Sequence, residues 1–236
     1  PEFYNLRVIE EKNCRLELLE CEIKNERLVL LQLHGGGYIG GMRNAYRSFA
    51  GLYSELGRGM SVLTVDYRVA PEHPYPAALE DAITGYNWLL QAGWQEHEIV
   101  VAGDSAGGGL ALALCMYLKN QNRKLPAGLI CMSPWTDLTQ SGASYDFNYE
   151  RDPLFGNTRD SLIYSKDYIQ DEDPTNPYIS PLYGNFSGFP PMLIQVGSYE
   201  MLLSDSELVQ KKRNVPDAKC GSVCTKECFI FFRWQC

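Results

Sequence analysis

The sequence predicts an α/β fold in which a mostly parallel central sheet carries helices on both faces. Two observations lead to this prediction. Short, nearly continuous apolar runs, as expected of strands buried in a parallel sheet, recur along the chain. Between them lie longer stretches of strong helix formers, an alternation typical of βαβ units. With 236 residues, 45% of them hydrophobic, the chain can bury one sizeable core.

The predicted elements follow one another regularly from residue 28 to residue 212. The strands are expected at residues 28–33, 61–66, 99–102, 129–132 and 192–196. The helices are expected at residues 46–56, 77–91, 108–120 and 205–212. Before them, residues 6–24 alternate less cleanly, and we expect them to form antiparallel edge strands.

Two regions interrupt this order. Residues 146–190 are rich in Asp, Asn, Pro, Tyr and Gly, with one helical piece near residues 161–169. A connection of this length is interpreted as an active-site lid or, equally, as a plain surface loop. From Arg213 onward the composition changes abruptly and has no helical period. We therefore assign residues 1–212 to one domain, and residues 213–236 to a cysteine-rich tail that belongs to no domain.

Charge and composition narrow the classes of function. The formal net charge of −8 leaves no electrostatic footprint for nucleic acid or an anionic membrane. No apolar run approaches the ~20 residues needed to span a bilayer. Small neutral or cationic substrates and a cytoplasmic location are the expectations that follow.

The eight cysteines fall into two groups. Four lie singly in apolar or strand-like surroundings and are expected to be reduced core residues, namely Cys14, Cys21, Cys115 and Cys131. Four crowd the tail, namely Cys220, Cys224, Cys228 and Cys236. The spacings in the tail do not match the usual metal-ligand pairs, so we predict no metal site.

Ser105 is the candidate nucleophile. It lies in a G-x-S-x-G pattern between an apolar strand and a stretch of helix formers, which is the arrangement of a nucleophile elbow. Such a turn is strained and needs glycine on both sides of the serine, and Gly103 and Gly107 meet this need. Asp104, beside the serine, is expected to stabilise the turn. The pattern indicates acyl transfer.

A glycine loop after the first long strand completes the expected chemistry. Gly35, Gly36 and Gly37 let bare backbone approach a carbonyl oxygen closely, and their N–H groups are candidate donors for an oxyanion hole together with the N–H of Ala106. His34 precedes these glycines and is expected to order the loop. The fingerprints of phosphate-binding glycine loops are absent from the sequence.

Taken together, these motifs resemble the hormone-sensitive-lipase-like branch of the α/β-hydrolases. The resemblance covers roughly residues 28–212 and rests on HGGGY (34–38), DYRVAPEHPYPAALEDA (66–82), GDSAGGGLA (103–111), SPWTDL (133–138) and VGSYEMLLSDS (196–206). It implies an α/β-hydrolase fold and a carboxylic ester hydrolase that needs no cofactor. The implied substrates are small, uncharged esters of short to medium acyl length.

The same resemblance places the catalytic acid just beyond the strand at residues 192–196. Glu200 occupies that place, and Asp205 is the alternative, one helical turn further on. Either carboxylate could accept the Nδ1 hydrogen bond of an imidazole. A third interpretation is that both are acids favoured at the start of a helix by the helix dipole.

The family histidine is not found where the resemblance places it. It is expected near residue 230, where Phe229, Ile230 and Phe231 stand, and the three histidines of the chain all precede Ser105. We therefore expect the C-terminal strand-helix unit to be missing or aberrant, and the activity to suffer. The alternative is a non-catalytic protein that binds small molecules on the same scaffold.

Overall fold

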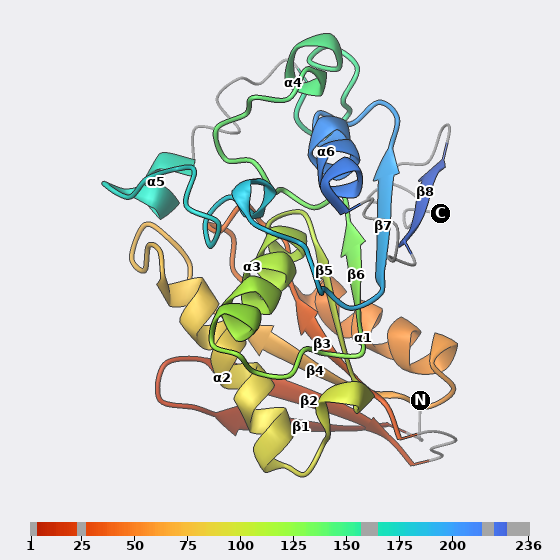
Figure 1. Ribbon diagram of the computed structural model, residues 1–236. Helices are drawn as coiled ribbons and strands as arrows, with labels where there is room; N and C mark the ends of the chain where they lie inside the picture. Colours follow the sequence, from red (N-terminus) through yellow and green to blue (C-terminus); the bar gives the residue numbers. More distant parts are fainter. Residues whose placement is uncertain (1–3, 23–26, 157–164, 214–219, 226–236) are drawn as a thin grey trace.

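The computed structural model describes residues 4–22, 27–156, 165–213 and 220–225, the last of these by its backbone only. Strands and helices alternate through most of this part of the chain (Figure 1). The strands are β1 (Tyr4–Glu10), β2 (Arg15–Cys21), β3 (Val29–Leu33), β4 (Ser61–Asp66), β5 (Ile99–Asp104), β6 (Gly128–Met132), β7 (Met192–Gly197) and β8 (Cys220–Thr225). The helices are α1 (Asn44–Leu56), α2 (Ala77–Gln91), α3 (Ala106–Asn120), α4 (Ser144–Phe147), α5 (Ser165–Ile169) and α6 (Leu203–Arg213), with short 3₁₀ turns η1 (Glu96–Glu98) and η3 (Pro181–Tyr183).

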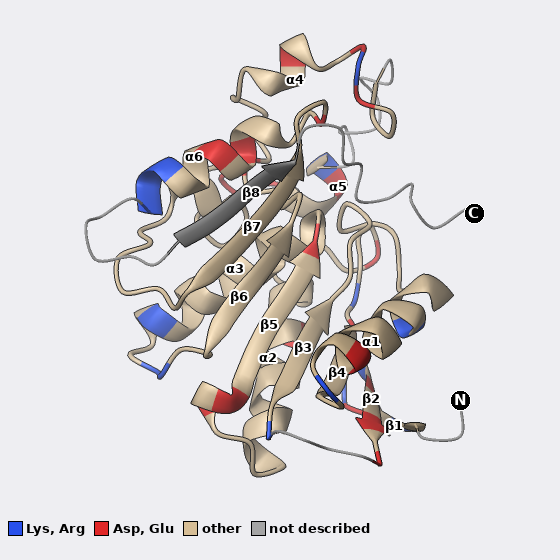
Figure 2. Ribbon diagram, turned by 90° about the vertical axis from the view of Figure 1, so that its right-hand side faces the viewer, with Lys and Arg blue, Asp and Glu red and all other residues tan. Residues whose placement is uncertain are grey.

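The strands form one sheet in the order β1-β2-β4-β3-β5-β6-β7-β8 (Figure 2). The pairs from β4 to β8 are parallel, whereas β1 and β2 are antiparallel to each other and β2 is antiparallel to β4. In the centre, Leu33 of β3 is paired with Gly103 of β5. Because these two strands are parallel neighbours, the segments that follow them leave the sheet at the same edge.

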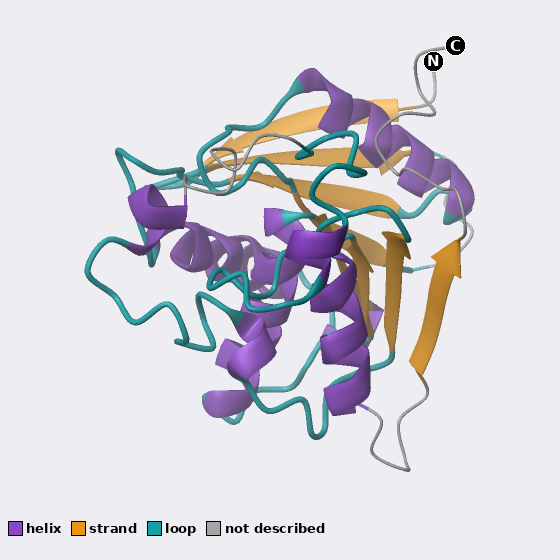
Figure 3. Cartoon of the chain, turned by 90° about the horizontal axis from the view of Figure 1, so that it is seen from above, coloured by secondary structure: helices purple, strands orange, loops and turns teal. Residues whose placement is uncertain are grey.

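Helices cover both faces of the sheet (Figure 3). The strand side chains show why, since alternate residues of β3 enter two separate buried clusters. Leu31 and Leu33 pack in the larger cluster with residues of α2 and α3. Leu30 packs in the smaller cluster with Ala50 of α1. A strand that is apolar on both faces therefore lies in a doubly covered sheet, as the sequence predicts.

The observed elements confirm the predicted fold and refine its edges. The first two strands are the antiparallel edge strands expected from residues 6–24. The helical piece expected near residues 161–169 is observed as α5, and residues 161–164 lie outside the described part of the chain. The described parts of the expected lid, residues 146–156 and 165–190, are mostly turns, and they also contain the end of α4 and η3.

The tail contributes a strand to the sheet. β8 pairs in parallel with β7 along residues 220–225. This strand lies within the cysteine-rich tail, in the region where we expected the C-terminal strand-helix unit to be missing or aberrant. The following residues, 226–236, including the place where the family histidine is expected, lie outside the described part of the chain.

Within the described residues, no helix is long and apolar enough to cross a membrane. The four isolated cysteines are free thiols, three of them buried and Cys21 half-buried, in agreement with the prediction of reduced residues. A cytoplasmic location stays a prediction of that cysteine pattern.

Candidate active site

Ser105 is the single residue between β5 and α3, and its backbone is strained. Its φ is 52° and its ψ is −121°, a conformation that L-residues rarely adopt. A Cβ at Gly103 would collide with the backbone of Gly107, and a Cβ at Gly107 would collide with the carbonyl of Leu33. The two glycines therefore make room for a sharp turn that places the serine at the carboxyl edge of the sheet.

Main-chain hydrogen bonds hold this turn against the next strand. The N–H of Ser105 donates to the carbonyl of Met132 at 2.9 Å, at the end of β6. The carbonyl of Ser105 accepts from the N–H groups of Trp135 at 2.9 Å and Gly109 at 3.1 Å. Ser105, the candidate nucleophile, is thus fixed by backbone from two neighbouring segments.

The glycine loop begins directly after β3, beside the turn. Gly36 has φ 126° and Gly37 has φ 63°, values that favour glycine, and a Cβ at Gly36 would lie 2.7 Å from the carbonyl oxygen of Gly40. Ala106 is the first residue of α3, so its N–H has no partner within the helix. Among the described residues, the N–H groups of Gly36 and Gly37 also donate no hydrogen bond.

Gly35 differs from the expectation that its N–H serves as an oxyanion donor. That N–H is shared between the hydroxyl of Tyr46 at 2.8 Å and Oδ1 of Asp104 at 3.1 Å. The Tyr46 hydroxyl in turn donates to Oδ2 of Asp104 at 3.0 Å. The physical reason for the difference is that a buried carboxylate attracts the nearest N–H, and Gly35 supplies it.

His34 is packed as a neutral ring under the glycine loop. Its ring stacks on Tyr67 with centroids 3.9 Å apart, and its Nδ1 lies 2.8 Å from the carbonyl oxygen of Gly35. Burial lowers the pKa of His34 to about 4, so the imidazole is uncharged at neutral pH. This placement agrees with a role in ordering the loop.

The other two histidines lie away from the turn or in solvent. His97 belongs to η1, at the amino end of β5, so the whole length of that strand, roughly 20 Å, separates it from Ser105. His73 is exposed on the segment after β4. Neither is placed as a base for Ser105.

Glu200 lies in the turn after β7 and is buried, with 8% of its surface exposed. Its Oε1 accepts the N–H of Gly197 at 2.9 Å. Burial raises the pKa of Glu200, while the nearby Ser133 hydroxyl and the Gly197 N–H favour the charged form. Ser133 directly follows Met132 of β6, whose carbonyl accepts the N–H of Ser105. The turn after β7 that contains Glu200, which we call the acid turn, therefore lies beside the nucleophile turn, with the end of β6 between them.

Side chains from residues 144–152, which we call the strap, hold the acid turn. Nδ2 of Asn148 donates to the carbonyls of Ser198 at 3.1 Å and Glu200 at 2.9 Å. Oδ2 of Asp152 accepts the N–H of Met201 at 2.7 Å. The strap overlaps in sequence with the start of residues 146–190, the segment that we interpreted as a lid or a loop. These contacts bind it to the acid turn.

Asp205, the alternative acid, has a different environment. It is fully buried at the start of α6, and its Oδ2 accepts the N–H groups of Thr136 at 2.7 Å and Asp137 at 2.8 Å. Burial raises the pKa of Asp205 to about 7. The carboxyl therefore anchors the segment that follows β6.

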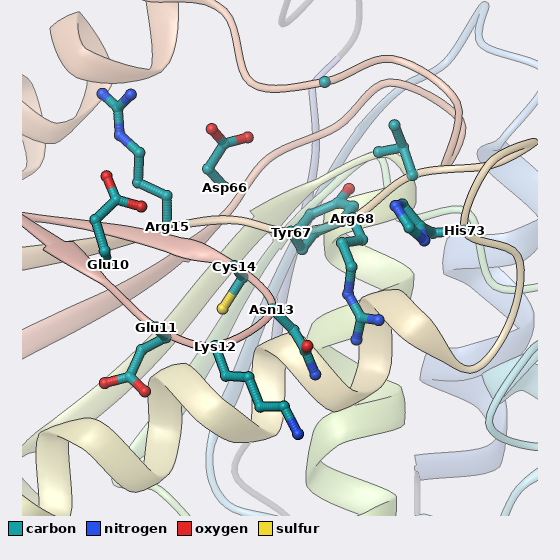
Figure 4. A pocket seen from close by; sticks show the side chains of 12 residues that line it. Glu10, Glu11, Lys12, Asn13, Cys14, Arg15, Asp66, Tyr67, Arg68 and His73 are labelled. Carbon is teal, nitrogen blue, oxygen red and sulfur yellow. The ribbon is translucent and has the colours of Figure 1, made fainter.

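A pocket of about 480 Å³ lies between the β1–β2 turn and the segment after β4 (Figure 4). Lys12, Asp66, Arg68 and His73 are among its lining side chains. Neither Ser105 nor Glu200 lines it, so it is separate from the nucleophile turn. Within the described residues, no group of three His, Cys, Asp or Glu side chains could hold a metal ion.

The structure adds three residues that sequence reasoning missed. Tyr46 is 58 positions from Asp104 along the chain, and no local pattern links the two. Asn148 and Asp152 stand in a polar stretch that resembles any surface loop, so only their contacts single them out. A strained serine elbow beside a glycine loop, on a parallel sheet covered on both faces, defines the serine-hydrolase class of α/β proteins.

Comparison with known proteins agrees with this class. The profile of a family described as alpha/beta hydrolase fold matches residues 30–232. An acetyl-hydrolase of Streptomyces hygroscopicus is 40% identical over 182 residues, which are 77% of this chain and 60% of that protein. An esterase of Acinetobacter venetianus is 38% identical over 218 residues, which are 91% of this chain and 70% of that protein.

Solved structures narrow the family further. The crystal structure of an esterase from the bacterial hormone-sensitive lipase family matches with a TM-score of 0.87 at 33% identity, covering 96% of this chain and 75% of that chain. The chain therefore belongs to the α/β-hydrolase fold family and is hormone-sensitive-lipase-like. The relatives in this family are named as ester hydrolases.

Proposed function

We propose that this chain is a carboxylic ester hydrolase that acts through Ser105 on small, uncharged esters of short to medium acyl length. The observation that carries the proposal is a serine with φ 52° directly beside a loop of glycines. The names of the two relatives, acetyl-hydrolase and esterase, support the same class of reaction. The proposal involves no cofactor.

In the proposed reaction, Oγ of Ser105 attacks the ester carbonyl carbon and the carbonyl electron pair moves onto oxygen. The N–H groups of Gly36, Gly37 and Ala106 receive that oxyanion. Gly35 is left out because its N–H is already shared between Tyr46 and Asp104. When the intermediate collapses, the bond to the alcohol oxygen breaks and the alcohol leaves with the proton that Oγ of Ser105 gave up. Water then attacks the carbonyl carbon of the acyl-serine, its hydroxyl leaves with the carboxylic acid, and its other proton returns to Oγ.

Glu200 is proposed as the catalytic acid in preference to Asp205. Its turn follows β7 at the carboxyl edge of the sheet, beside the end of β6 that holds the nucleophile turn. Asp205 already receives two backbone N–H groups on Oδ2, which supports a structural role. Glu200 would orient an imidazole by accepting its Nδ1–H.

No side chain is assigned as the proton acceptor for Ser105. The chain has three histidines, all before Ser105, and the surroundings of His34 and His97 argue against them as the base. Removing the triad histidine of a serine protease lowers turnover about 10⁶-fold. This observation favours a second candidate function, the binding of small molecules without turnover on the same scaffold.

Hydrolysis of p-nitrophenyl butyrate by the purified chain, beside a Ser105→Ala control, tests the two candidates. Turnover that disappears in the control supports the esterase. Turnover equal to the control, in a chain that unfolds cooperatively, rejects it, and calorimetric titration with uncharged esters then tests the binding protein.

The choice of acid has its own test in a chain that shows Ser105-dependent turnover. Glu200→Gln is expected to lower kcat by about 10⁴-fold, the loss seen when a triad acid becomes an amide. Asp205→Asn should leave kcat within about 10-fold and change mainly the stability of the fold. The reverse ranking would assign the acid to Asp205.

A further inference from the structure

We propose that Asp104 and Tyr46 are positioning residues that hold the glycine loop against the nucleophile turn. The inference rests on the proposed function, because it concerns the donors of the same oxyanion hole. Asp104 immediately precedes Ser105 in the chain, and Tyr46 comes from α1 on the far side of the glycine loop. Neither side chain is assigned a chemical step.

Three hydrogen bonds form a closed triangle between the two motifs. The N–H of Gly35 is shared between Tyr46 and Asp104, and Tyr46 donates to the second oxygen of Asp104. A Cβ at Gly35 would collide with Oδ2 of Asp104, so the carboxylate occupies the space that a side chain would take. The first residue of the loop is therefore fitted to the residue before the nucleophile.

The loop needs such an anchor because of its composition. Glycine has more backbone freedom than any other residue, and both Gly36 and Gly37 lie at positive φ. Their N–H groups are useful to an oxyanion only if they are held in place before the reaction. Fixing the peptide unit at Gly35 fixes the start of the loop and limits the directions of the next two N–H groups.

The chemistry of Asp104 supports a role beyond folding. Its carboxyl is fully buried, and burial raises its pKa to about 6, so it is ionised at neutral pH. The titratable groups that face it are the hydroxyls of Tyr46 and Tyr53 on α1 and of Tyr67 after β4, none of them cationic. An uncompensated buried charge is costly, and a neutral amide would satisfy the same N–H at a lower cost. A charged carboxylate is a stronger acceptor for the N–H of Gly35 and the hydroxyl of Tyr46 than a neutral amide oxygen would be.

Kinetics of three variants test the inference. Asp104→Asn keeps the shape and loses the charge, and Tyr46→Phe keeps the charge and loses the two hydrogen bonds of the hydroxyl. Tyr53→Phe is the matched control, because Tyr53 also lies on α1 near Asp104, but its hydroxyl donates to the sulfur of Met132 at 3.7 Å and takes no part in the three bonds that link Asp104, Tyr46 and Gly35. We expect kcat to fall about 10- to 100-fold in Asp104→Asn and less in Tyr46→Phe, with KM within about 2-fold and no change in Tyr53→Phe.

The pH dependence separates positioning from folding. In the unsubstituted chain, kcat should carry an ionisation near the pKa of Asp104, and Asp104→Asn should lack it while melting at the same or a higher temperature. Unchanged kcat in Asp104→Asn, or an equal loss in Tyr53→Phe, would overturn the inference.

A second measurement needs no activity and so separates this inference from the proposed function. Amide hydrogen exchange at Gly35, followed by NMR, should be about 10-fold or more faster in Asp104→Asn and Tyr46→Phe than in the unsubstituted chain and in Tyr53→Phe. If the chain proves inactive but exchange at Gly35 accelerates as expected, the positioning role of Asp104 and Tyr46 is supported and the esterase proposal fails. If exchange at Gly35 is unchanged in both Asp104→Asn and Tyr46→Phe, the positioning role is rejected.

Discussion

On the nucleophile side of the site, Ser105 is held mainly by backbone, with glycines at points of contact where no side chain fits. On the acid side, Glu200 is held by its own turn and by Asn148, which lies 52 positions earlier in the chain. The first arrangement tolerates almost no change of residue type at its glycines. The second depends on individual polar side chains, each of which can be removed without a collision.

This difference shows how one site combines rigid and adjustable parts. The proposed nucleophile and the proposed oxyanion donors must keep their geometry within a fraction of an ångström to act as such, and packed main chain provides that precision. The acid acts through another group, so its turn can be held by a few hydrogen bonds of about 1 kcal/mol each. Four substitutions test whether the two sides differ as described.

The largest effect is expected at Gly107. A Cβ there meets the carbonyls of Leu33, the last residue of β3, and of His34, the residue that follows it, and neither can move without disturbing the end of that strand. Gly107→Ala should lower the free energy of unfolding by about 3 kcal/mol or more, measured by urea denaturation. Gly51→Ala is the control, because Gly51 lies inside α1 with open space around its Cβ, and it should raise that free energy by up to about 1 kcal/mol.

The next effect concerns the pH dependence of stability. Burial raises the pKa of Asp104 from its ordinary value of 3.8 to about 6, so the folded state binds more protons than the unfolded state between these values. Its contribution is therefore fully present at low pH and is lost as the pH rises through about 6. Between about pH 4.5 and pH 7.5 this loss amounts to about 2 kcal/mol.

Asp104→Asn should remove that loss. Glu200 and Asp205 also have raised pKa values and contribute with the same sign, but they do so equally in both proteins. The difference between the two pH profiles, measured by denaturant unfolding, isolates Asp104. Parallel profiles would mean that folding does not raise the pKa of Asp104.

A smaller effect is expected from the strap. Asn148→Ala removes the amide donor of the Ser198 carbonyl and one of the two donors of the Glu200 carbonyl, and it should cost about 2 kcal/mol of stability. In an active chain we expect kcat to fall about 10-fold. Asn120→Ala is the control, because its amide bonds the hydroxyl of Tyr178 at an exposed position. Wild-type stability and turnover in Asn148→Ala would show that the strap does not hold the acid.

The smallest effect is expected at the rim of the acid turn. The guanidinium of Arg151 lies 4.6 Å from the ring centroid of Tyr199, an exposed cation–π contact. Arg151→Ala should cost about 0.5 kcal/mol and change kcat less than 2-fold, whereas Arg151→Lys should retain part of the contact. A cost above that of Asn148→Ala would show that the buried amide is not the main support of this side.

The fold could be predicted from sequence because its signals are local. Each central strand is a short apolar run, and the glycines around Ser105 mark a turn whose strain lies within five residues. The nucleophile side shares this property, which explains why candidate residues for it could be proposed from local patterns in the sequence. The N–H of Gly35 was the exception, since its partners on α1 and β5 are invisible to a local pattern.

The acid side was harder for the opposite reason. Glu200 could be placed only through a family resemblance, and the strap was interpreted as a lid or a surface loop. The bonds of Asn148 and Asp152 to the turn after β7 span about fifty positions of the chain, and such contacts depend on how the finished fold brings segments together. Polar residues in an irregular segment carry no period that would reveal a buried partner.

The pairing of Leu33 with Gly103 sets the position of the glycine loop relative to Ser105 as well as the packing of β3. A slip of one residue between β3 and β5 would shift the glycine loop by about 3.3 Å relative to Ser105 and turn each apolar side chain of β3 toward the wrong cluster. A substitution that weakens this register therefore has two costs, because it disturbs the packing of the core and it displaces the glycine loop from Ser105. Insertions in the turns at the opposite ends of these strands, such as the turn around Gly93, do not change the pairing of β3 with β5. These turns should therefore be the positions where the chain changes its length with the smallest loss of stability.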